Sequence, residues 1–163
     1  MIPLDQLRTF VQYDQATGNF VWLVKRPGIS AGVGEVAGRI SNQGYVQVQI
    51  KGRRYQAHRL AWFYVRGEWP FGEIDHINGC KTDNRLVNLR LATRSQNQAN
   101  NGRSLRNRSG RKGVGWNANA GKWQVQIGVH GKVFYLGLFD NIEAASNAYA
   151  KAATRFFGEF ARP

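Results

Sequence analysis

Residues 75–97, DHINGCKTDNRLVNLRLATRSQN, constrain the fold of this chain more than any other stretch. An acid and a histidine stand together after the short lead Glu73-Ile74, and a loop rich in asparagine and glycine follows them. These loop residues favour turns. The run NLRLAT then reads as a strand, and SQNQAN begins a helix. We therefore predict two short strands, a polar loop between them and a helix, which together gather polar side chains in a small volume.

The charge of the chain favours a polyanionic partner. Lys and Arg number 23 against 10 Asp and Glu, which gives a net charge of +13 and a sequence pI near 10.6. Residues 1–99 and 100–163 are both basic, so the surplus is spread along the chain. A surplus of this size is typical of proteins that bind nucleic acid. Nucleic acid is therefore the leading candidate partner.

Apolar content and cysteine usage narrow the class further. No apolar run approaches the roughly 20 residues that span a bilayer, and the amino terminus lacks the basic start and apolar core of a signal peptide. We therefore expect a soluble intracellular protein with no membrane partner. Cys80 is the single cysteine, which excludes an internal disulfide and a multi-cysteine zinc site. Any bound metal must be held by oxygen and histidine nitrogen, and no structural zinc is expected.

Periodicity predicts the elements that precede the Asp-His stretch. Leu4 to Val11 has helical spacing, and the run FVWLV after it reads as a strand. Residues 44–57 alternate apolar and polar side chains on both sides of the turn KGR, which is typical of a β-hairpin. HRLAWFYVRG then has helical spacing and ends at Gly67, so we expect a helix that covers the hairpin.

A basic segment divides the chain into two predicted domains. Residues 101–112 hold five basic side chains and no acidic ones, so we interpret them as a linker between a domain at 1–100 and a domain at 113–163. Side chains along a phosphate backbone release counterions and make binding depend on salt. The alternative is a solvated tether that keeps the protein soluble. The basic residues of this segment are Arg103, Arg106, Arg108, Arg111 and Lys112.

The carboxyl-terminal part predicts a small sheet and one long helix. VGW, WQVQIGV and KVFYLGLF read as three short antiparallel strands, with Trp123, Val125 and Ile127 on one face of the second and glutamines on the other. Asp140 and Glu143 suggest a capping box at the start of the helix. Its expected apolar stripe is Ile142, Ala145, Tyr149, Ala152 and Phe156. The fold class is therefore α+β.

The polar groups of residues 75–97 match the needs of phosphodiester hydrolysis. That reaction requires a base for water, a group that orients the base, and a cation near the charge that develops on the phosphate. Hard oxygen donors suit Mg²⁺ or Mn²⁺, which keep several waters and need only one or two protein ligands.

The run HRL at 58–60, followed by DHINGCKTDNRLVNLRLATRSQNQ, resembles the HNH endonucleases found in phages and introns as homing enzymes. The resemblance implies a ββα-metal core at about residues 72–101. It also implies that Asp75 and Asn97 are metal ligands, that His76 is the general base, and that Asn88 braces the loop and orients His76. A histidine base must be neutral, so activity should fall below about pH 6.5. The role of His58 stays open between a phosphate contact and a structural hydrogen bond.

The tail, from KGV through GKW and YLGLFD to EAASNAYAKAA, resembles the APETALA-two or ethylene-response-factor domain of plant transcription factors. In that family a three-stranded sheet packed on one helix lies in the major groove. The resemblance implies that the free face of the sheet reads DNA. Glutamine can pair with adenine through two hydrogen bonds, so Gln124 or Gln126 is a candidate reader. The nominated DNA contacts are Lys112, Trp116, Asn117, Gln124, Gln126 and Tyr135; packing is an equal alternative for Trp116 and Tyr135.

Together these features predict a metal-dependent, site-specific, homing-like endonuclease for double-stranded DNA. It would act as a monomer or as a dimer assembled on DNA, in the cytoplasm of a bacterial host if a phage encodes it. One alternative is a regulator that binds DNA without cutting it. An RNA-binding module is a weaker alternative, because the sheet resembles a reader of duplex DNA.

Overall fold

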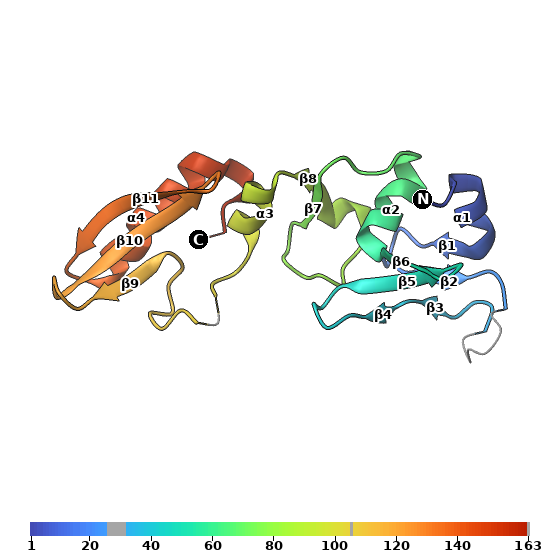
Figure 1. The fold of residues 1–163 in the computed structure, drawn as a ribbon, viewed down its shortest axis with the longest axis horizontal. Coiled ribbons are helices and arrows are strands. Elements are labelled where there is room, and N and C mark those ends of the chain that lie inside the picture. Colours follow the sequence, from blue (N-terminus) through green and yellow to red (C-terminus); the bar gives the residue numbers. More distant parts are fainter. Residues whose placement is uncertain (26–31, 105, 163) are drawn as a thin grey trace. The chain divides into compact units, whose positions relative to one another are not determined.

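A computed structural model describes residues 1–25, 32–104 and 106–162 (Figure 1). The fold is mixed α+β, and the chain divides into two compact units, Met1–Leu91 and Ala92–Pro163. Within the described residues, the helices are too short or too polar to cross a membrane.

The first unit holds two small three-stranded sheets, one long helix and a two-stranded sheet, the β7-β8 hairpin. Its strands pair in the orders β1-β2-β3, β4-β5-β6 and β7-β8. The elements are α1 (Leu4–Phe10), β1 (Val11–Tyr13), β2 (Phe20–Trp22), β3 (Val36–Ala37), β4 (Arg39–Ile40), β5 (Val46–Ile50), β6 (Arg53–Gln56), α2 (Ala57–Arg66), β7 (Glu73–His76), the 3-10 turn η1 (Leu86–Asn88) and β8 (Leu89–Ala92).

The core of the first unit lies between α2 and the sheets. Phe20, Trp22, Val48 and Leu60 are almost fully buried there. The expected hairpin at 44–57 is confirmed, since β5 and β6 pair antiparallel around the turn at Lys51 and Gly52. The predicted end of helix α2 at Gly67 is also confirmed.

Gly67 ends α2 because it adopts a left-handed conformation, and its amide donates to Phe63 O. Glycine reaches this conformation without the steric cost of a β-carbon. The helix packs on β5 and β6 and therefore sets the position of His58 in its first turn.

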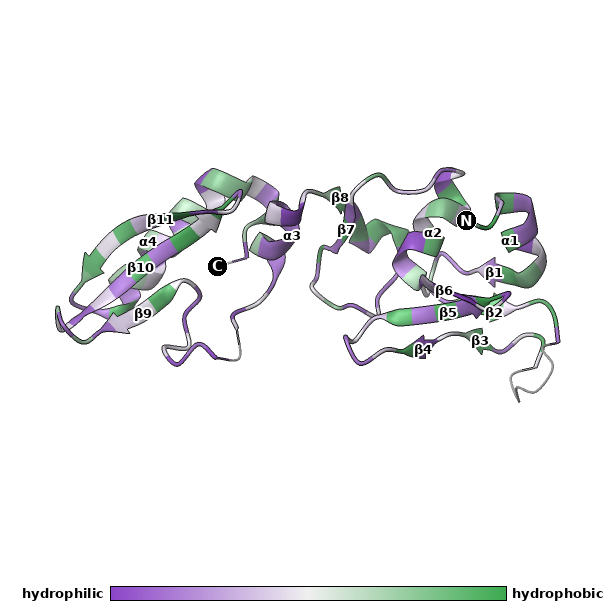
Figure 2. Ribbon diagram, in the orientation of Figure 1, coloured by the Kyte–Doolittle hydropathy of each residue, from purple (hydrophilic) through white to green (hydrophobic). Residues whose placement is uncertain are grey.

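The second unit is a three-stranded antiparallel sheet of order β11-β10-β9 with α4 packed on one face. Along β10, Val125, Ile127 and Val129 are buried, and the alternation of apolar and polar residues is visible in Figure 2. The elements are α3 (Arg94–Asn100), β9 (Val114–Asn117), β10 (Lys122–Val129), β11 (Lys132–Phe139), α4 (Ile142–Phe157) and the 3-10 turn η2 (Gly158–Phe160).

Two details of α4 differ from the sequence prediction. Asn141, not Asp140, caps the helix, because the Asn141 side chain accepts a hydrogen bond from Ala144 N at 2.7 Å. The buried stripe also ends one residue later than expected, with Ala153 and Phe157 in place of Ala152 and Phe156. The buried residues Ala145, Tyr149, Ala153 and Phe157 follow one another in steps of four, whereas the predicted stripe alternated steps of three and four.

The region expected to form a boundary and a linker is largely ordered within the second unit. Helix α3 groups with this unit, since Ala99 and Asn100 are buried and α3 packs on α4 and η2. Residues 106–114 form a tight turn, in which Ser109 Oγ donates to Val114 O at 2.7 Å and Asn107 Nδ2 donates to Arg111 O at 2.8 Å. Charge content alone did not indicate this turn, because its stability comes from uncharged side chains.

Candidate active site

The Asp-His pair lies at the end of β7, which also contributes Ile74 to the core. Asp75 and His76 are only 3% and 5% exposed. Directly after them the chain turns: Gly79 N donates to His76 O at 2.7 Å, and Gly79 has φ of +72°, which favours glycine. The strand before the pair and the turn after it hold both side chains in place.

Asn88 braces the loop between β7 and β8. Its Oδ1 accepts from Asn78 N at 3.0 Å, and its Nδ2 donates to Asp83 O at 2.8 Å. The Asp83 carboxylate in turn accepts from Asn78 Nδ2 and from Arg85, which lowers the pKa of Asp83 to about 2, with the Arg85 hydrogen bond as the largest cause. The expected bracing role of Asn88 therefore has a direct structural basis.

Asn84, rather than Asn88, is the loop amide that contacts the imidazole. His76 Nε2 lies 3.3 Å from Asn84 Oδ1, and Asn84 is 2% exposed. Asn84 Nδ2 donates to Thr82 O at 3.1 Å, so it is the carbonyl end of the amide that faces the ring. The expectation that Asn88 orients His76 is therefore corrected. Asn88 forms its hydrogen bonds with the loop backbone, and it is Asn84 that contacts the imidazole of His76.

The Asn84 carbonyl defines the tautomer of neutral His76. A carbonyl oxygen can only accept, so Nε2 carries the ring proton and Nδ1 carries the lone pair. Nδ1 is therefore the atom of His76 that can take a proton from water.

The turn at residues 14–19 supports Asn84 from the other side. Tyr13 Oη donates to Asn84 O at 2.8 Å. Gly18 has φ of +76°, and a β-carbon there would lie 2.4 Å from Arg85 N. Only glycine lets the turn approach the loop this closely. A side chain at position 18 would push the loop that carries Asn84 away from His76.

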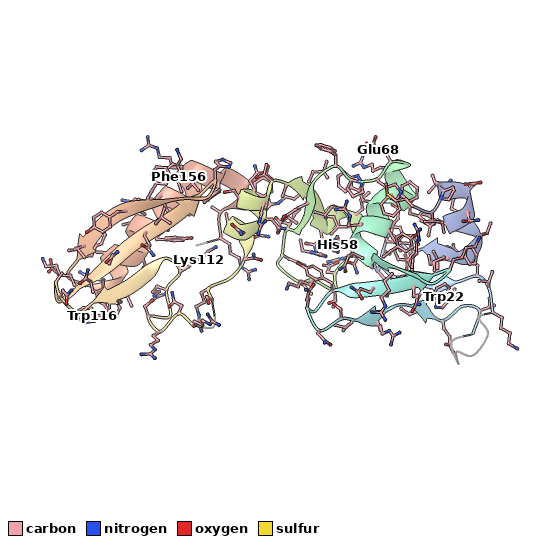
Figure 3. The ribbon with its side chains drawn as sticks, in the orientation of Figure 1. Trp22, His58, Glu68, Lys112, Trp116 and Phe156 are labelled. Atoms are coloured by element: carbon pink, nitrogen blue, oxygen red, sulfur yellow. The ribbon has the colours of Figure 1, made fainter. Side chains whose placement is uncertain are left out.

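Two further rings enclose His76. His58 lies 5.0 Å from it, ring centroid to centroid, in an edge-to-face arrangement, and Tyr45 lies 6.0 Å from it. Figure 3 shows His58 on α2. Burial, then the neighbouring His76 and Arg59, lower the pKa of His58 to about 3, so the ring is neutral at any working pH. His58 Nδ1 has no hydrogen-bond partner among the described residues, which argues against the structural hydrogen bond considered from the sequence.

The same enclosure shifts the titration of His76. Burial lowers the pKa of His76, while the Asn84 hydrogen bond and the charge of Asp75 act in the opposite direction. A base must be neutral to accept a proton, so the acid side of a pH profile should lie below the ordinary value of about 6.5. We therefore expect activity to fall at a lower pH than the value of about 6.5 expected from the sequence.

Asp75 is paired with an arginine that the sequence reasoning missed. Arg90 Nε donates to Asp75 Oδ2 at 2.8 Å, and the two side chains are 13% and 4% exposed. Arg90 lies on β8, the partner strand of β7. The run NLR after Asn84 contains this arginine and was the available signal in the sequence. Its pairing with Asp75 also depends on the register of β7 and β8, which the sequence alone does not give.

The remaining proposed ligand, Asn97, lies on α3 in the second unit. A capping box at Thr93 and Gln96 begins this helix, and Asn97 N donates to Thr93 O at 2.9 Å. Asn97 is half-buried. The first unit thus brings together Asp75, His76 and the Asn84 loop. The role of Asn97 as a metal ligand stays a prediction from the sequence.

In the second unit four of the nominated DNA contacts share the face of the sheet opposite α4. Gln124 and Gln126 lie on this face of β10, and Tyr135 is the cross-strand partner of Gln126. Asn117 Nδ2 donates to Gln124 Oε1 at 2.9 Å. The side chains of Gln126 and Tyr135 are exposed, and a groove of about 330 Å³ lies beside the glutamines.

Trp116 differs from these four. It pairs with Trp123 across the strands, and cross-strand partners point to the same face. Trp123 packs on the core, so Trp116 belongs to the α4 side, where the two rings meet edge to face at 5.0 Å. Its side chain is 56% exposed, and Trp116 also lines the groove beside Gln124 and Gln126.

The basic residues of 101–112 fall into two groups. Arg103, Arg106, Arg108 and Arg111 are exposed. Lys112 Nζ instead donates to three backbone carbonyls, those of Ala99, Asn101 at 2.6 Å and Arg162 at 2.9 Å. An ammonium has three N–H donors, so these bonds use all of them and leave none for a phosphate. The prediction of Lys112 as a DNA contact is therefore replaced by a structural role.

The first unit suits a hard divalent cation in its donor chemistry. The carboxylate of Asp75 is an oxygen donor of the kind that Mg²⁺ and Mn²⁺ prefer. Within residues 1–25, 32–104 and 106–162, histidine, cysteine and acidic side chains form no cluster of three. Mg²⁺ commonly keeps several waters and needs only one or two protein ligands.

Comparison with known proteins agrees with this site. The family model described as HNH endonuclease matches residues 55–99, which include His58, Asp75, His76, Asn88 and Asn97. Protein 3.8 of Escherichia phage T7 is 32% identical over 106 residues, which are 64% of this chain and 87% of that protein.

A solved structure described as DNA binding and cleavage by the HNH homing endonuclease I-HmuI is also similar. It is 26% identical with a TM-score of 0.42, and the match covers 56% of this chain and 51% of that chain. The chain thus spans about half the length of that enzyme. From the family match over the Asp-His hairpin and the geometry of His76 within it, the chain belongs to the HNH endonuclease family and is a nuclease.

Proposed function

We propose that the protein is a metal-dependent endonuclease that hydrolyses phosphodiester bonds in double-stranded DNA at preferred sites. The observation that carries this proposal is the environment of His76: a buried imidazole whose Nε2 faces Asn84 and whose neighbour in sequence is the buried carboxylate Asp75. This arrangement gives one base with a defined proton-accepting atom beside one site for a cation.

The assignment of roles follows from these contacts. Nδ1 of His76 takes a proton from water, and the oxygen of that water forms a bond to phosphorus as the bond to the 3′ oxygen breaks. The leaving 3′ oxygen takes up a proton from a solvent water, so the products are a 5′-phosphate and a 3′-hydroxyl. Asp75 would hold a divalent cation, which when bound would supply positive charge to the phosphate as negative charge develops. Asn84 orients the base, and Asn88 keeps the loop of Asn84 in place.

Removal of divalent metal tests this proposal. We expect cutting of supercoiled plasmid in Mg²⁺ to fall by about 100-fold or more in EDTA, because a cation contributes several kcal/mol to such reactions. Excess Mg²⁺ or Mn²⁺ should restore it. Gel electrophoresis measures the rate and separates nicked from linear product, which also tells a monomer that cuts one strand from a dimer that cuts both. Equal cutting in EDTA would exclude the metal.

We also propose that the free face of β9, β10 and β11 selects the site. Gln124 is held by Asn117, and a glutamine held in one orientation is suited to pair with adenine. The four exposed arginines at 103–111 would contact phosphates and so contribute affinity without selectivity.

Substitution of both glutamines tests the selecting face. Gln124→Ala with Gln126→Ala should reduce the preference for bound sites over random DNA by about 5- to 150-fold, the value of one bidentate base contact. Selection from a random duplex pool at fixed salt measures the preference. Gln98→Ala, an exposed glutamine of α3, is the matched control. A uniform loss of affinity with the preference intact would show that the face binds DNA without reading it.

A further inference from the structure

The carboxylate proposed to hold the cation is already engaged by a cation of the protein. Arg90 Nε donates to Asp75 Oδ2 at 2.8 Å in a largely buried pair. A buried carboxylate without such a partner is costly, so Arg90 stabilises Asp75 when no metal is bound. The pair lies at the proposed site, not on the surface of the fold.

This pair differs from the other arginine-aspartate pair of the hairpin. Arg85 and Asp83 meet at 2.6 Å, and Arg85 is mostly exposed. Asp83 also accepts bonds that fix the loop, so that pair has a complete structural explanation. The pair of Arg90 and Asp75 sits instead on the one carboxylate to which the family mechanism gives a chemical role.

A divalent cation and a guanidinium compete for one carboxylate. Without DNA, a cation at Asp75 would lie next to the Arg90 guanidinium that donates to the same carboxylate, and repulsion between the two cations is only weakly screened in a buried site. A phosphate adds negative charge at the same place. The planar guanidinium also matches phosphate oxygens through two parallel hydrogen bonds. DNA therefore relieves the competition.

We propose that Arg90 couples metal binding to DNA binding: it holds Asp75 in the free protein and turns its guanidinium toward the scissile phosphate when cation and DNA are both present. This inference rests on the proposed function, because it takes Asp75 as a metal ligand. Coupling between two ligands is reciprocal, so DNA should raise the affinity for metal by the same factor as metal raises the affinity for DNA. The free protein would then bind metal weakly and would not cut before it is loaded on a duplex.

Mn²⁺ titration of the full chain, followed by electron paramagnetic resonance, tests the first half of the coupling. Arg90→Gln should bind Mn²⁺ about tenfold or more tightly than the wild type in the absence of DNA, because one competing charge is gone. The same variant should cut plasmid more slowly, because the phosphate contact is lost. If Arg90 were purely structural, its substitution would not give both tighter Mn²⁺ binding and slower cleavage. Arg66→Gln, which removes one exposed charge of the same unit, should leave the Mn²⁺ affinity unchanged.

Fluorescence anisotropy with a labelled duplex tests the second half. In a His76→Ala background, which keeps the DNA uncut, Mn²⁺ should raise DNA affinity, and Arg90→Gln should remove most of that gain. Arg90→Lys keeps the charge without the planar fork, so its Mn²⁺ affinity should match the wild type while the gain falls. If thermal unfolding shows that Arg90→Gln does not fold, Arg90→Lys is the deciding variant. The proposal is overturned if Arg90→Lys keeps the whole Mn²⁺-dependent gain in DNA affinity and cuts plasmid at the wild-type rate.

Asp75→Asn separates failure of this inference from failure of the proposed function. If Asp75→Asn binds Mn²⁺ as the wild type does, Asp75 is not a ligand and the metal assignment fails. If Asp75→Asn weakens Mn²⁺ binding while Arg90→Gln leaves it unchanged, the assignment survives and the coupling role of Arg90 is refuted.

Discussion

His76→Ala is expected to slow plasmid cleavage in Mg²⁺ by a factor of about 10² to 10⁴, the usual contribution of a positioned general base. The substitution removes Nδ1, the atom that takes the proton from water, and leaves Asp75 and its pair with Arg90 in place. The affinity for DNA should therefore stay unchanged. Single-turnover cleavage of supercoiled plasmid measures the rate, and a mobility shift in Ca²⁺ measures the binding.

His130→Ala is the matched control for this result. His130 is an exposed histidine in the turn between β10 and β11, so its loss should leave the cleavage rate unchanged. Cleavage by His76→Ala at the wild-type rate would contradict the assignment of the base. Equal loss of cleavage and of DNA binding would instead assign His76 to binding.

The candidate site was predictable from sequence where its parts are close along the chain. Asp75 and His76 are adjacent and lie at the end of β7, so the sequence indicated their proximity, and the family resemblance implied the roles that are proposed for them. The partner of the imidazole was not predictable in the same way. Asn84 and Asn88 lie in one loop and have the same side chain, and their roles depend on which amide the loop conformation turns toward the ring.

Contacts that require register or burial were also out of reach. Arg90 meets Asp75 only because β7 and β8 pair, and periodicity does not give the register of two short strands. Trp116 was nominated beside Gln124, yet the pairing with Trp123 places it on the opposite face. By contrast, local turn and capping residues predict the hairpin of β5 and β6 and the end of α2 at Gly67. Such residues can be recognised in the sequence without knowledge of long-range contacts.

Lys112 illustrates how charge content misleads about a single residue. It lies among five basic residues in a segment without acids, and the sequence favoured contact with DNA for all of them. The structure places its ammonium between α3 and the end of the chain, where it joins three segments of the second unit (Figure 3). The aliphatic stem of a lysine allows this partial burial, and carbonyl oxygens replace the water around its charge.

Lys112→Met is therefore expected to lower the free energy of unfolding of the second unit by about 3 to 5 kcal/mol, because three backbone carbonyls lose a charged donor while the apolar stem is kept. Hydrogen exchange of the amides in β10 and α4 should accelerate by about 10² to 10⁴-fold, while the amides of the first unit should keep their rates.

Lys122→Met is the control for this prediction, because Lys122 forms an exposed pair with Asp140 at 3.0 Å. Such surface pairs contribute about 0 to 1 kcal/mol, so its exchange rates should change little. If Lys112 contacted phosphate instead, Lys112→Met would leave exchange unchanged and reduce the salt dependence of DNA binding by about one counterion. The two roles thus predict opposite outcomes in two measurements on the same variant.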